Sequence, residues 1–292
     1  MGRHAYLIMA HHRFEILREI LRDIDDERND IFLHIDKKTK NVDFASLKEC
    51  AQVANLYFTS RIDVHWGGYS QSACMLQLLS EAVNRGKHDY YHFMVGVEFP
   101  LKTQDYIHAF MDRHLGKEFI GYDNFAQNYT DRVKYLHFFN EHGRSKNYLG
   151  RSLDILRRKM VALQKLLGYT YITATTDNFK KGNACMSITH DLAKHILSCK
   201  EQIKRLYKHS YCSDELFIHT LVYNSPFYDN VFDKNDEYIS SMRMCQWEEG
   251  KNNQYHVKDV DMLIKSGRLF ARKIDGDDAL EVIRLIKERR RE

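Results

Sequence analysis

This 292-residue chain contains only two prolines and two tryptophans, and it lacks the sequence patterns of several protein classes. No stretch approaches the roughly 18 apolar residues that a membrane-spanning helix requires, so an integral membrane protein is not expected. The six cysteines are scattered and form no Cys-x-x-Cys pair, which argues against a zinc site or a dithiol redox motif. The apolar run HAYLIMA near the N-terminus has the wrong length and flanks for a signal peptide. We therefore expect a cytoplasmic protein with reduced thiols.

Motifs of several enzyme classes are also missing. The chain has no Gly-x-Gly-x-x-Gly after the first apolar run, no phosphate loop ending in Gly-Lys-Ser/Thr, no His-Glu-x-x-His and no Gly-x-Ser-x-Gly. Asp-x-Asp triplets occur at 23–25, 259–261 and 275–277, but none follows a buried strand, where it could hold a metal. The adjacent His11 and His12 point in different directions on a helix or a strand. We therefore predict no metal site.

The amino-acid composition is that of an ordinary globular protein. Hydrophobic residues make up 43% and charged residues 29%, so the chain can bury a sizeable core. Aromatic residues reach 12%, and most of them must lie in that core. The 44 basic and 40 acidic residues give a net charge of +4, which is too balanced to indicate a nucleic-acid partner.

Short apolar runs typical of buried strands alternate with segments of helical periodicity in the first third of the chain. The predicted strands are 4–10, 31–35 and 55–58, the segment 89–101 is predicted as a strand that runs into a loop, and the predicted helices between them are 13–24, 43–52 and 70–84. This alternation with short connections predicts a parallel sheet that is covered by helices on both faces. In such sheets ligands bind beyond the carboxyl ends of the strands, which directs attention to 9–12, 36–38 and 96–101.

The second part of the chain is less regular. We predict helices at 104–114, 151–167, 190–206 and 214–223, and strands near 118–122, 170–173 and 184–188. No repeat, low-complexity stretch or Gly/Ser linker divides the chain, so we predict one domain over 1–292. Within it we expect a nucleotide-binding half (1–103), an acceptor and catalytic half (104–277) and a C-terminal basic amphipathic helix (278–292).

Several stretches, in the same order along the chain, resemble those of one enzyme family. HAYLIMAHHRFEILREIL, followed by IFLHIDKKT, resembles the opening of the "Branch" glycosyltransferases. WGGYSQSACMLQLL, YYHFMVGVEFPLKTQDYI and LIKSGRLFARKID resemble further motifs of that family, and SDELFIHTLVYNSPF falls where the family has Pro-Asp-Glu-x-x-x-x-Thr-Leu. The family comprises core-2/I-branching β-1,6-N-acetylglucosaminyltransferases and peptide O-xylosyltransferases. The resemblance covers nearly the whole chain.

The resemblance implies a GT-A-like, Rossmann-type fold with a mixed sheet flanked by helices, and an inverting transfer from a UDP-sugar without a metal. Some residues depart from the family pattern: Glu98 stands where Asp is usual, Gly96 follows Val rather than Ser, and Cys185 replaces a Trp. The membrane anchor and disulfides of animal relatives are missing, which suggests a bacterial-type cytoplasmic enzyme. No cofactor is expected.

An acid pair in SDELFIHTLVYNSPF carries the catalytic expectation. Asp214 and Glu215 could simply cap a helix, because first-turn acids offset its dipole. The resemblance instead implies that Glu215 is the base that takes the proton from the acceptor hydroxyl, with Asp214 orienting the turn. The same resemblance matches Lys273, and less securely Arg243, to cations that stabilise the leaving diphosphate. Alternatively, Lys273 could be an ordinary solvated cation, and Arg243 could have a structural role.

Further residues are carried over with weaker matches. Asp36 matches a uridine-binding acid but could be a turn residue, and the backbones of Met9, Ala10 and His11 would line the uracil. Four side chains could bind the substrate, although each could instead have a purely structural role: Glu98, Trp66, Trp247 and Asp214. A surface around Arg132, Tyr135 and His137 could contact the acceptor, although an ordinary surface is the simpler interpretation.

The predicted function is transfer of a sugar, most simply N-acetylglucosamine, from a UDP-sugar to a glycan or lipid-linked saccharide in bacterial surface polysaccharide synthesis. Alternatives are another UDP-sugar donor, with xylose or a galactose form, and a non-catalytic protein that binds sugar nucleotides or glycans. The C-terminal helix, DALEVIRLIKERRRE, could pack against the domain or touch the inner face of an anionic membrane.

Overall fold

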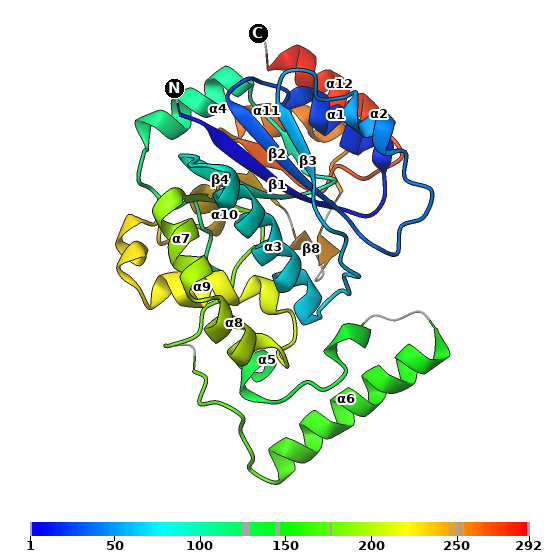
Figure 1. The fold of residues 1–292 in the computed structure, drawn as a ribbon, viewed down its shortest axis with the longest axis vertical. Helices are drawn as coiled ribbons and strands as arrows, with labels where there is room; N and C mark the ends of the chain where they lie inside the picture. Colours follow the sequence, from blue (N-terminus) through cyan, green and yellow to red (C-terminus); the bar gives the residue numbers. More distant parts are fainter. Residues whose placement is uncertain are drawn as a thin grey trace.

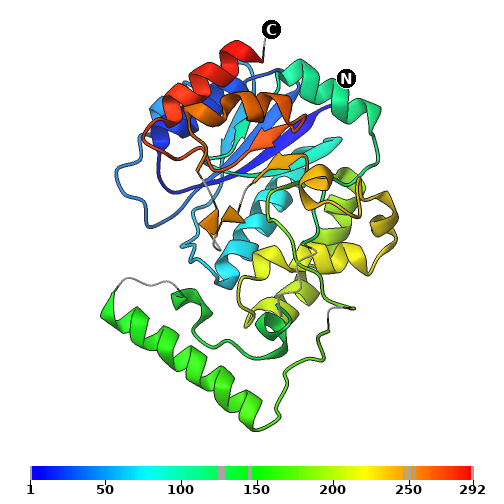
Figure 2. The same cartoon turned by 180° about the vertical axis from the view of Figure 1, so that it is seen from behind.

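The computed structural model describes residues 2–123, 129–143, 147–175, 177–245, 247–248, 251–252 and 254–290. Figures 1 and 2 show the fold from opposite sides. The strands are β1 (His4–Ala10), β2 (Asn29–Ile35), β3 (Asn55–Phe58), β4 (Tyr90–Val95), β5 (Phe99–Pro100), β6 (Met186–Thr189), β7 (Arg243–Met244), β8 (Trp247–Glu248), β9 (Lys251–Asn252) and β10 (Phe270–Ala271). The α-helices are α1 (Phe14–Asp23), α2 (Phe44–Lys48), α3 (Tyr69–Arg85), α4 (Gln104–Arg113), α5 (Asp131–Lys134), α6 (Tyr148–Leu166), α7 (His190–Ser198), α8 (Lys200–Tyr207), α9 (Phe217–Tyr223), α10 (Glu237–Ser241), α11 (Val260–Lys265) and α12 (Ala279–Arg289). Short 3-10 helices are η1 (Asn140–His142), η2 (Ser213–Glu215), η3 (Pro226–Asn230) and η4 (Val257–Asp259).

The main sheet confirms the predicted α/β class with a mixed sheet flanked by helices. Its five strands have the order β3-β2-β1-β4-β6. The strands β1 to β4 run parallel, as the βα alternation predicted, whereas β6 pairs antiparallel with β4. The strand order reverses between β2 and β4 around β1, so the carboxyl end of β1 lies at the switch point where such sheets bind ligands.

Two hydrophobic cores lie on opposite faces of this sheet because successive strand residues point to opposite sides. Tyr6 and Ile8 of β1 belong to one core, together with apolar residues of α1, α4, α11 and α12. Ala5 and Leu7 belong to the other core, together with apolar residues of α3, α7 and α9. Every residue of β2 is buried, as expected for a strand that is covered on both faces.

Small sheets and a projecting helix complete the fold. The strands β5, β10 and β7 form a sheet of three, and β8 pairs with β9. This arrangement brings residues near 99, 243 and 271 together beside the main sheet. The helix α6 lies at one end of the molecule, apart from the main sheet, in both views (Figures 1 and 2). Among the described residues, no helix is long and apolar enough to cross a membrane.

The second half of the chain departs from the sequence prediction at several points. The predicted strand 118–122 is wrong, because only isolated bridges form, from Glu118, Phe119 and Tyr122. The segment 170–173 is irregular rather than a strand. The predicted helix 190–206 is two helices, α7 and α8, which meet at Cys199. The predicted helix 214–223 is a 3-10 turn followed by α9, because Leu216 has φ −120° and ψ −45°.

The C-terminal helix packs against the protein. Ala279, Val282, Ile283 and Ile286 of α12 are buried in the core that includes α1. Its cations are engaged: Arg284 pairs with Glu281 and Glu288, Lys287 with Glu19, Arg289 with Asp261 and Arg290 with Asp23. Of the two interpretations that the sequence left open, packing against the domain is therefore the one that α12 displays.

Candidate active site

The carboxyl ends of β1, β2 and β4 meet at one edge of the sheet. The Gly96 N–H donates to the Met9 carbonyl, and the Asp36 N–H donates to the Ala10 carbonyl, each at 2.9 Å. A Cβ atom at position 96 would lie 2.8 Å from the Ala10 Cβ, so only glycine allows this close approach. The candidate uracil-binding backbone of β1 and its neighbours thus has a defined position, and each of these carbonyls keeps a second lone pair.

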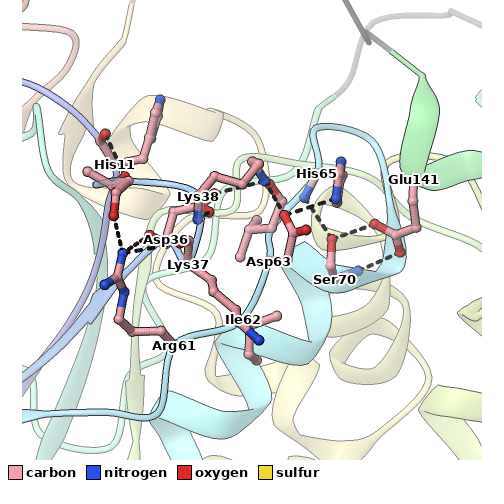
Figure 3. A network of polar contacts seen from close by, with 12 residues as sticks. His11, Asp36, Lys37, Lys38, Arg61, Ile62, Asp63, His65, Ser70 and Glu141 are labelled. Carbon is pink, nitrogen blue, oxygen red and sulfur yellow. Dashed lines mark hydrogen bonds and ion pairs between the residues drawn. The ribbon is translucent and has the colours of Figure 1, made fainter. Parts of the chain in front are cut away.

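The loop after β2 is held by a polar network (Figure 3). The Arg61 guanidinium donates to the carbonyls of Ile35 at 3.1 Å and Asp36 at 2.6 Å, and it also reaches the Thr39 carbonyl. The Thr39 hydroxyl in turn donates to the His11 carbonyl at 3.0 Å. The half-buried Arg61 therefore holds the loop after β2, and Thr39 ties that loop to the end of β1.

Asp36 organises the same loop from within. Its carboxylate accepts a hydrogen bond from the Lys38 N–H at 2.8 Å and lies 3.2 Å from the Lys38 ammonium. Lys38 also pairs with Asp63 at 2.5 Å, and Asp63 lies 3.0 Å from His65 (Figure 3). Asp36 is 7% exposed. Asp36 thus has the turn role that the sequence offered as an alternative to uridine binding.

Lys273 lies next to this edge of the sheet. The Ile274 N–H donates to the Val97 carbonyl at 3.0 Å, which places 273 and 274 beside the turn after β4. Burial lowers the pKa of His11, and so do His12 and Lys273, while Asp36 and Asp275 oppose the change. His11, Asp36 and Lys273 therefore share one neighbourhood. Within the described part of the chain, the Lys273 ammonium forms no hydrogen bond or ion pair.

A buried ion pair lies directly behind the turn after β4. Glu98 Oε1 is 3.3 Å from Arg243 Nε, and both side chains are 0% exposed. Arg243 also donates to the Ser187 hydroxyl at 3.1 Å and to the Ser241 carbonyl at 2.5 Å. Burial raises the pKa of Glu98, and Arg243 and Arg272 oppose the rise. Complete burial of a charged pair is costly unless the partners stay together, so this pair holds β7 against the loop at Glu98.

Arg272 connects this pair to the acid turn at 213–215. Its guanidinium lies 3.2 Å from the Cys185 Sγ. Burial raises the pKa of Cys185 to about 12, so the thiol stays neutral. Burial also raises the pKa of Asp214 to about 7, with the Glu215 charge adding to the rise and Arg132 and Arg272 opposing it. The charge of Arg272 thus opposes the pKa rise of both Glu98 and Asp214.

The carboxylate of Glu215 is partly exposed and held by cations. Arg132 donates to Glu215 Oε2 at 2.6 Å, and the Lys181 ammonium lies 3.9 Å from the same oxygen. Lys181 pairs more closely with Asp123, at 2.6 Å. The Glu215 side chain is 27% exposed, whereas Asp214 is buried and accepts a hydrogen bond from Gln71 at 3.3 Å. Of the two acids, Glu215 is the one that solvent or a ligand can reach.

The Trp66 loop packs on the same turn. The Cys212 N–H donates to the Gly67 carbonyl at 2.9 Å, and the Trp66 ring meets the Tyr211 ring edge-on with centroids 5.7 Å apart. Gly67 has φ +77°, and a Cβ there would lie 2.8 Å from the Tyr211 ring. Trp66 is 42% exposed, so a face is open to a ligand. Trp247 lies on β8, and its side chain falls outside the described part of the structure.

The Asp-x-Asp triplets have structural roles. Asp23 pairs with Arg290, and Asp25 accepts hydrogen bonds from the backbone N–H groups of 52–54. Asp259 caps η4, and Asp275 lies 3.4 Å from an Arg13 nitrogen. Across the residues that the structure describes, no group of three or more His, Cys, Asp or Glu side chains is placed to hold a metal ion.

The structure also shows two arginines near the acid turn whose partners the sequence does not reveal. The sequence predicts for Arg132 no more than a place on a possible acceptor surface, whereas the structure shows it as the ion-pair partner of Glu215. Arg272, which the sequence does not single out, contacts Cys185, and its charge opposes the pKa rise of Glu98 and Asp214. No local pattern could reveal these partners, because they are far apart along the chain.

Sequence comparison relates the chain to known proteins. The family model described as "Branch: Core-2/I-Branching enzyme" matches residues 4–266. "Xylosyltransferase 2" of Canis lupus familiaris is 22% identical over 308 residues, which cover 97% of this chain and 33% of the relative. "Xylosyltransferase" of Ciona intestinalis is 21% identical over 267 residues, which cover 88% of this chain and 28% of the relative. The chain thus spans about a third of the length of these curated relatives.

A structural comparison finds a more distant likeness. The crystal structure of mouse xyloside xylosyltransferase 1 in its apo form is 12% identical, with a TM-score of 0.27. The match covers 75% of this chain and 79% of the mouse chain. A likeness this weak adds nothing to the description of the fold given above.

Proposed function

The chain belongs to the core-2/I-branching (Branch) family of glycosyltransferases, and we propose that it moves a sugar from a UDP-sugar to a glycan hydroxyl with inversion. The observation that carries the proposal is the partly exposed Glu215 carboxylate, which Arg132 holds next to buried Asp214 on the turn that packs against the Trp66 loop. A reachable base and a sheet edge suited to a nucleotide are the two sites that such a transfer needs.

In this proposal Glu215 is the base. The acceptor hydroxyl approaches the partly exposed carboxylate and gives up its proton as its oxygen attacks the anomeric carbon from the face opposite to the leaving diphosphate. Arg132 aims the carboxylate, because its N–H group holds Oε2 at 2.6 Å. The second oxygen, Oε1, is then available to the acceptor. Buried Asp214 shapes the turn and contacts Gln71 rather than the acceptor.

Lys273 stabilises the leaving diphosphate in the same proposal. Its ammonium is not engaged by another described side chain, and it lies near His11 and Asp36 at the end of the strands. A cation that is already in place needs no reorganisation as charge develops on the phosphate oxygens. Arg243 is fully buried against Glu98, so we assign it to positioning the Glu98 loop beside Lys273 rather than to a direct diphosphate contact. No metal is required in this scheme.

The donor and acceptor are proposed more broadly. N-acetylglucosamine is the first candidate sugar, because the matching family model is described by core-2/I-branching enzymes. Xylose is the second, because the similar curated proteins are named xylosyltransferases; a galactose form is a third. We place the reaction in bacterial surface polysaccharide synthesis, at the cytoplasmic side of the membrane, with a glycan or lipid-linked saccharide as acceptor. A non-catalytic sugar-nucleotide or glycan-binding protein is the alternative.

A thermal-shift panel of nucleotide sugars tests the donor, because a ligand that binds only the native state raises the melting temperature. UDP and one UDP-sugar should raise it, whereas ADP and GDP should not. Release of UDP is then measured with that UDP-sugar and a panel of oligosaccharide acceptors. Acceptor-dependent release supports the enzyme, binding without release on any acceptor supports the non-catalytic alternative, and no response to any uridine nucleotide contradicts both.

A further inference from the structure

The helix α6 exposes apolar side chains on the side that faces away from the protein. Tyr148 is 89% exposed and Leu166 is 83% exposed. Further large apolar residues of the helix and its C-terminal end are also exposed, namely Leu149, Ile155, Leu156, Leu163, Leu167 and Tyr169. A helix on the surface of a globular protein normally turns such residues toward the core. In α6 the orientation is the reverse.

The inner side of α6 is held by polar contacts, beside the half-buried Leu153, Met160 and Val161. Arg157 is buried and donates to Asp154 at 2.9 Å, and it also lies 3.0 Å from His137. Gln164 makes two hydrogen bonds of 2.9 Å with the backbone of Leu136. Lys165 pairs with Asp131 at 2.5 Å. These polar contacts fix which side of the helix faces the protein, so the exposed apolar side follows from them.

Three of the exposed leucines lie along one side of α6. Leu149, Leu156 and Leu163 recur every seven residues, so they line up along one side of the helix. Tyr148 and Tyr169 stand at its two ends. Aromatic residues with a polar tip are enriched where a membrane meets water. An apolar stripe of this length that ends in tyrosines is suited to a lipid surface.

Cations lie at the edge of the apolar surface and, at Lys159, within it, and they distinguish between its occupants. Arg151 and Lys159 are exposed and form no ion pair within the described residues, and Arg158 is also exposed. The one acid of the helix, Asp154, is buried between Arg157 and Arg158. Two copies of α6 packed together would therefore bring like charges side by side, which is unfavourable. An anionic surface accepts both the leucines and the cations.

We propose that α6 is an interfacial helix that binds the surface of an anionic lipid bilayer, with its leucine stripe at the acyl boundary and its cations at the headgroups. The helix is connected to the acid turn, because the Arg157 guanidinium lies 4.3 Å from the centre of the Tyr211 ring. Binding would bring Glu215 close to lipid-linked saccharides. That consequence rests on the proposed function, whereas the lipid binding itself does not.

Co-sedimentation of the full chain with vesicles tests the proposal. Vesicles of phosphatidylcholine are compared with an equal mixture of phosphatidylcholine and phosphatidylglycerol, at low and high salt. We expect preferential binding to the anionic vesicles that weakens with salt, because salt screens the headgroup charge. Replacing Leu149, Leu156 and Leu163 together by Glu should abolish binding. The pair Arg151→Glu and Lys159→Glu should weaken it by at least about fivefold for each cation.

Matched controls separate this effect from general surface changes. Leu280→Glu on α12 alters a leucine that is 47% exposed, and Lys194→Glu reverses an exposed cation on α7; both should bind vesicles like the wild type. Circular dichroism and melting temperature should be unchanged in every variant, because the altered side chains are exposed. The proposal is overturned if the wild type ignores anionic vesicles, or if the triple Glu variant still binds them. A third result would also overturn it: the wild type forms a dimer in sedimentation velocity and does not bind vesicles, and the triple Glu variant is a monomer.

Discussion

The substitution Glu215→Gln tests the proposed base with little disturbance of the fold. Gln has the same size and its carbonyl can still accept the Arg132 hydrogen bond, but it cannot take a proton at neutral pH. Arg132 would lose an ion pair in which its own side chain is 28% and that of Glu215 is 27% exposed. Ion pairs with this much solvent contact are worth at most about 1 kcal/mol. The melting temperature should therefore fall by no more than about 4 °C.

The expected loss of rate is much larger than this loss of stability. General-base catalysis typically contributes about 10²- to 10⁴-fold, which corresponds to about 2.7–5.4 kcal/mol in the activation free energy. A residue that only capped η2 would change stability by about 0.3–1 kcal/mol and would leave the rate unaltered. The two roles therefore predict different outcomes for kcat, and UDP affinity should be retained under both.

The assay is the initial rate of UDP release with the donor and acceptor identified by the panel, together with the melting temperature. Glu201→Gln is the matched control, because it removes an exposed first-turn glutamate from α8, and it should keep the wild-type rate. Asp214→Asn should have a milder effect than Glu215→Gln if Asp214 only shapes the turn. A stable Glu215→Gln protein with a near wild-type rate would refute the assignment. The base would then have to be sought elsewhere, with Glu98 next.

Three further predictions concern the donor site and a buried acid. Lys273→Ala should weaken UDP binding in calorimetry and slow transfer by roughly 10²–10³-fold. The control Lys265→Ala, on the exposed side of α11, should change neither quantity. If Lys273→Ala leaves UDP binding and turnover unchanged, Lys273 does not belong to the site. Transfer should continue in excess EDTA, and a loss of rate that manganese or magnesium restores would contradict the metal-free scheme. Burial raises the pKa of Glu118 from 4.5 to about 7, so the native state holds a proton that the unfolded state releases, and stability falls as the pH rises from about 4.5 to 7. Glu118→Gln can keep both hydrogen bonds to Thr189. It should raise the free energy of unfolding by up to about 3 kcal/mol at pH 8 but little at pH 4. Denaturant titrations at the two pH values measure this difference.

The first third of the fold was predictable because local periodicity and long-range packing agree there. The strand predicted at 4–10 is β1, and the helix predicted at 70–84 is α3, which extends one residue further at each end. Each apolar run in this region is bounded by polar residues, and each connection is short, so the βα alternation dictates the topology. The candidate nucleotide side of the site follows from that topology.

The second half was less predictable because its structure depends on distant partners. The bridges at Glu118, Phe119 and Tyr122 are made with residues 231, 187 and 182, so no continuous strand pair exists for a local pattern to reveal. The break between α7 and α8 occurs at Cys199 with φ −90° and ψ 5°, although no glycine or proline marks it. The ion pairs of Glu98 with Arg243 and of Glu215 with Arg132 likewise join remote segments.

The polar attachment of α6 has a thermodynamic consequence. Because no residue of α6 belongs to either hydrophobic core, the apolar surface that its release would expose is small and comes from the half-buried Leu153, Met160 and Val161. Both the heat capacity of unfolding and its sensitivity to denaturant scale with exposed surface. Release of α6 would therefore be nearly invisible in a calorimeter or a urea titration, and amide hydrogen exchange would report it as a separate opening below the global transition. We therefore expect α6 to open as a separate unit while both hydrophobic cores stay closed.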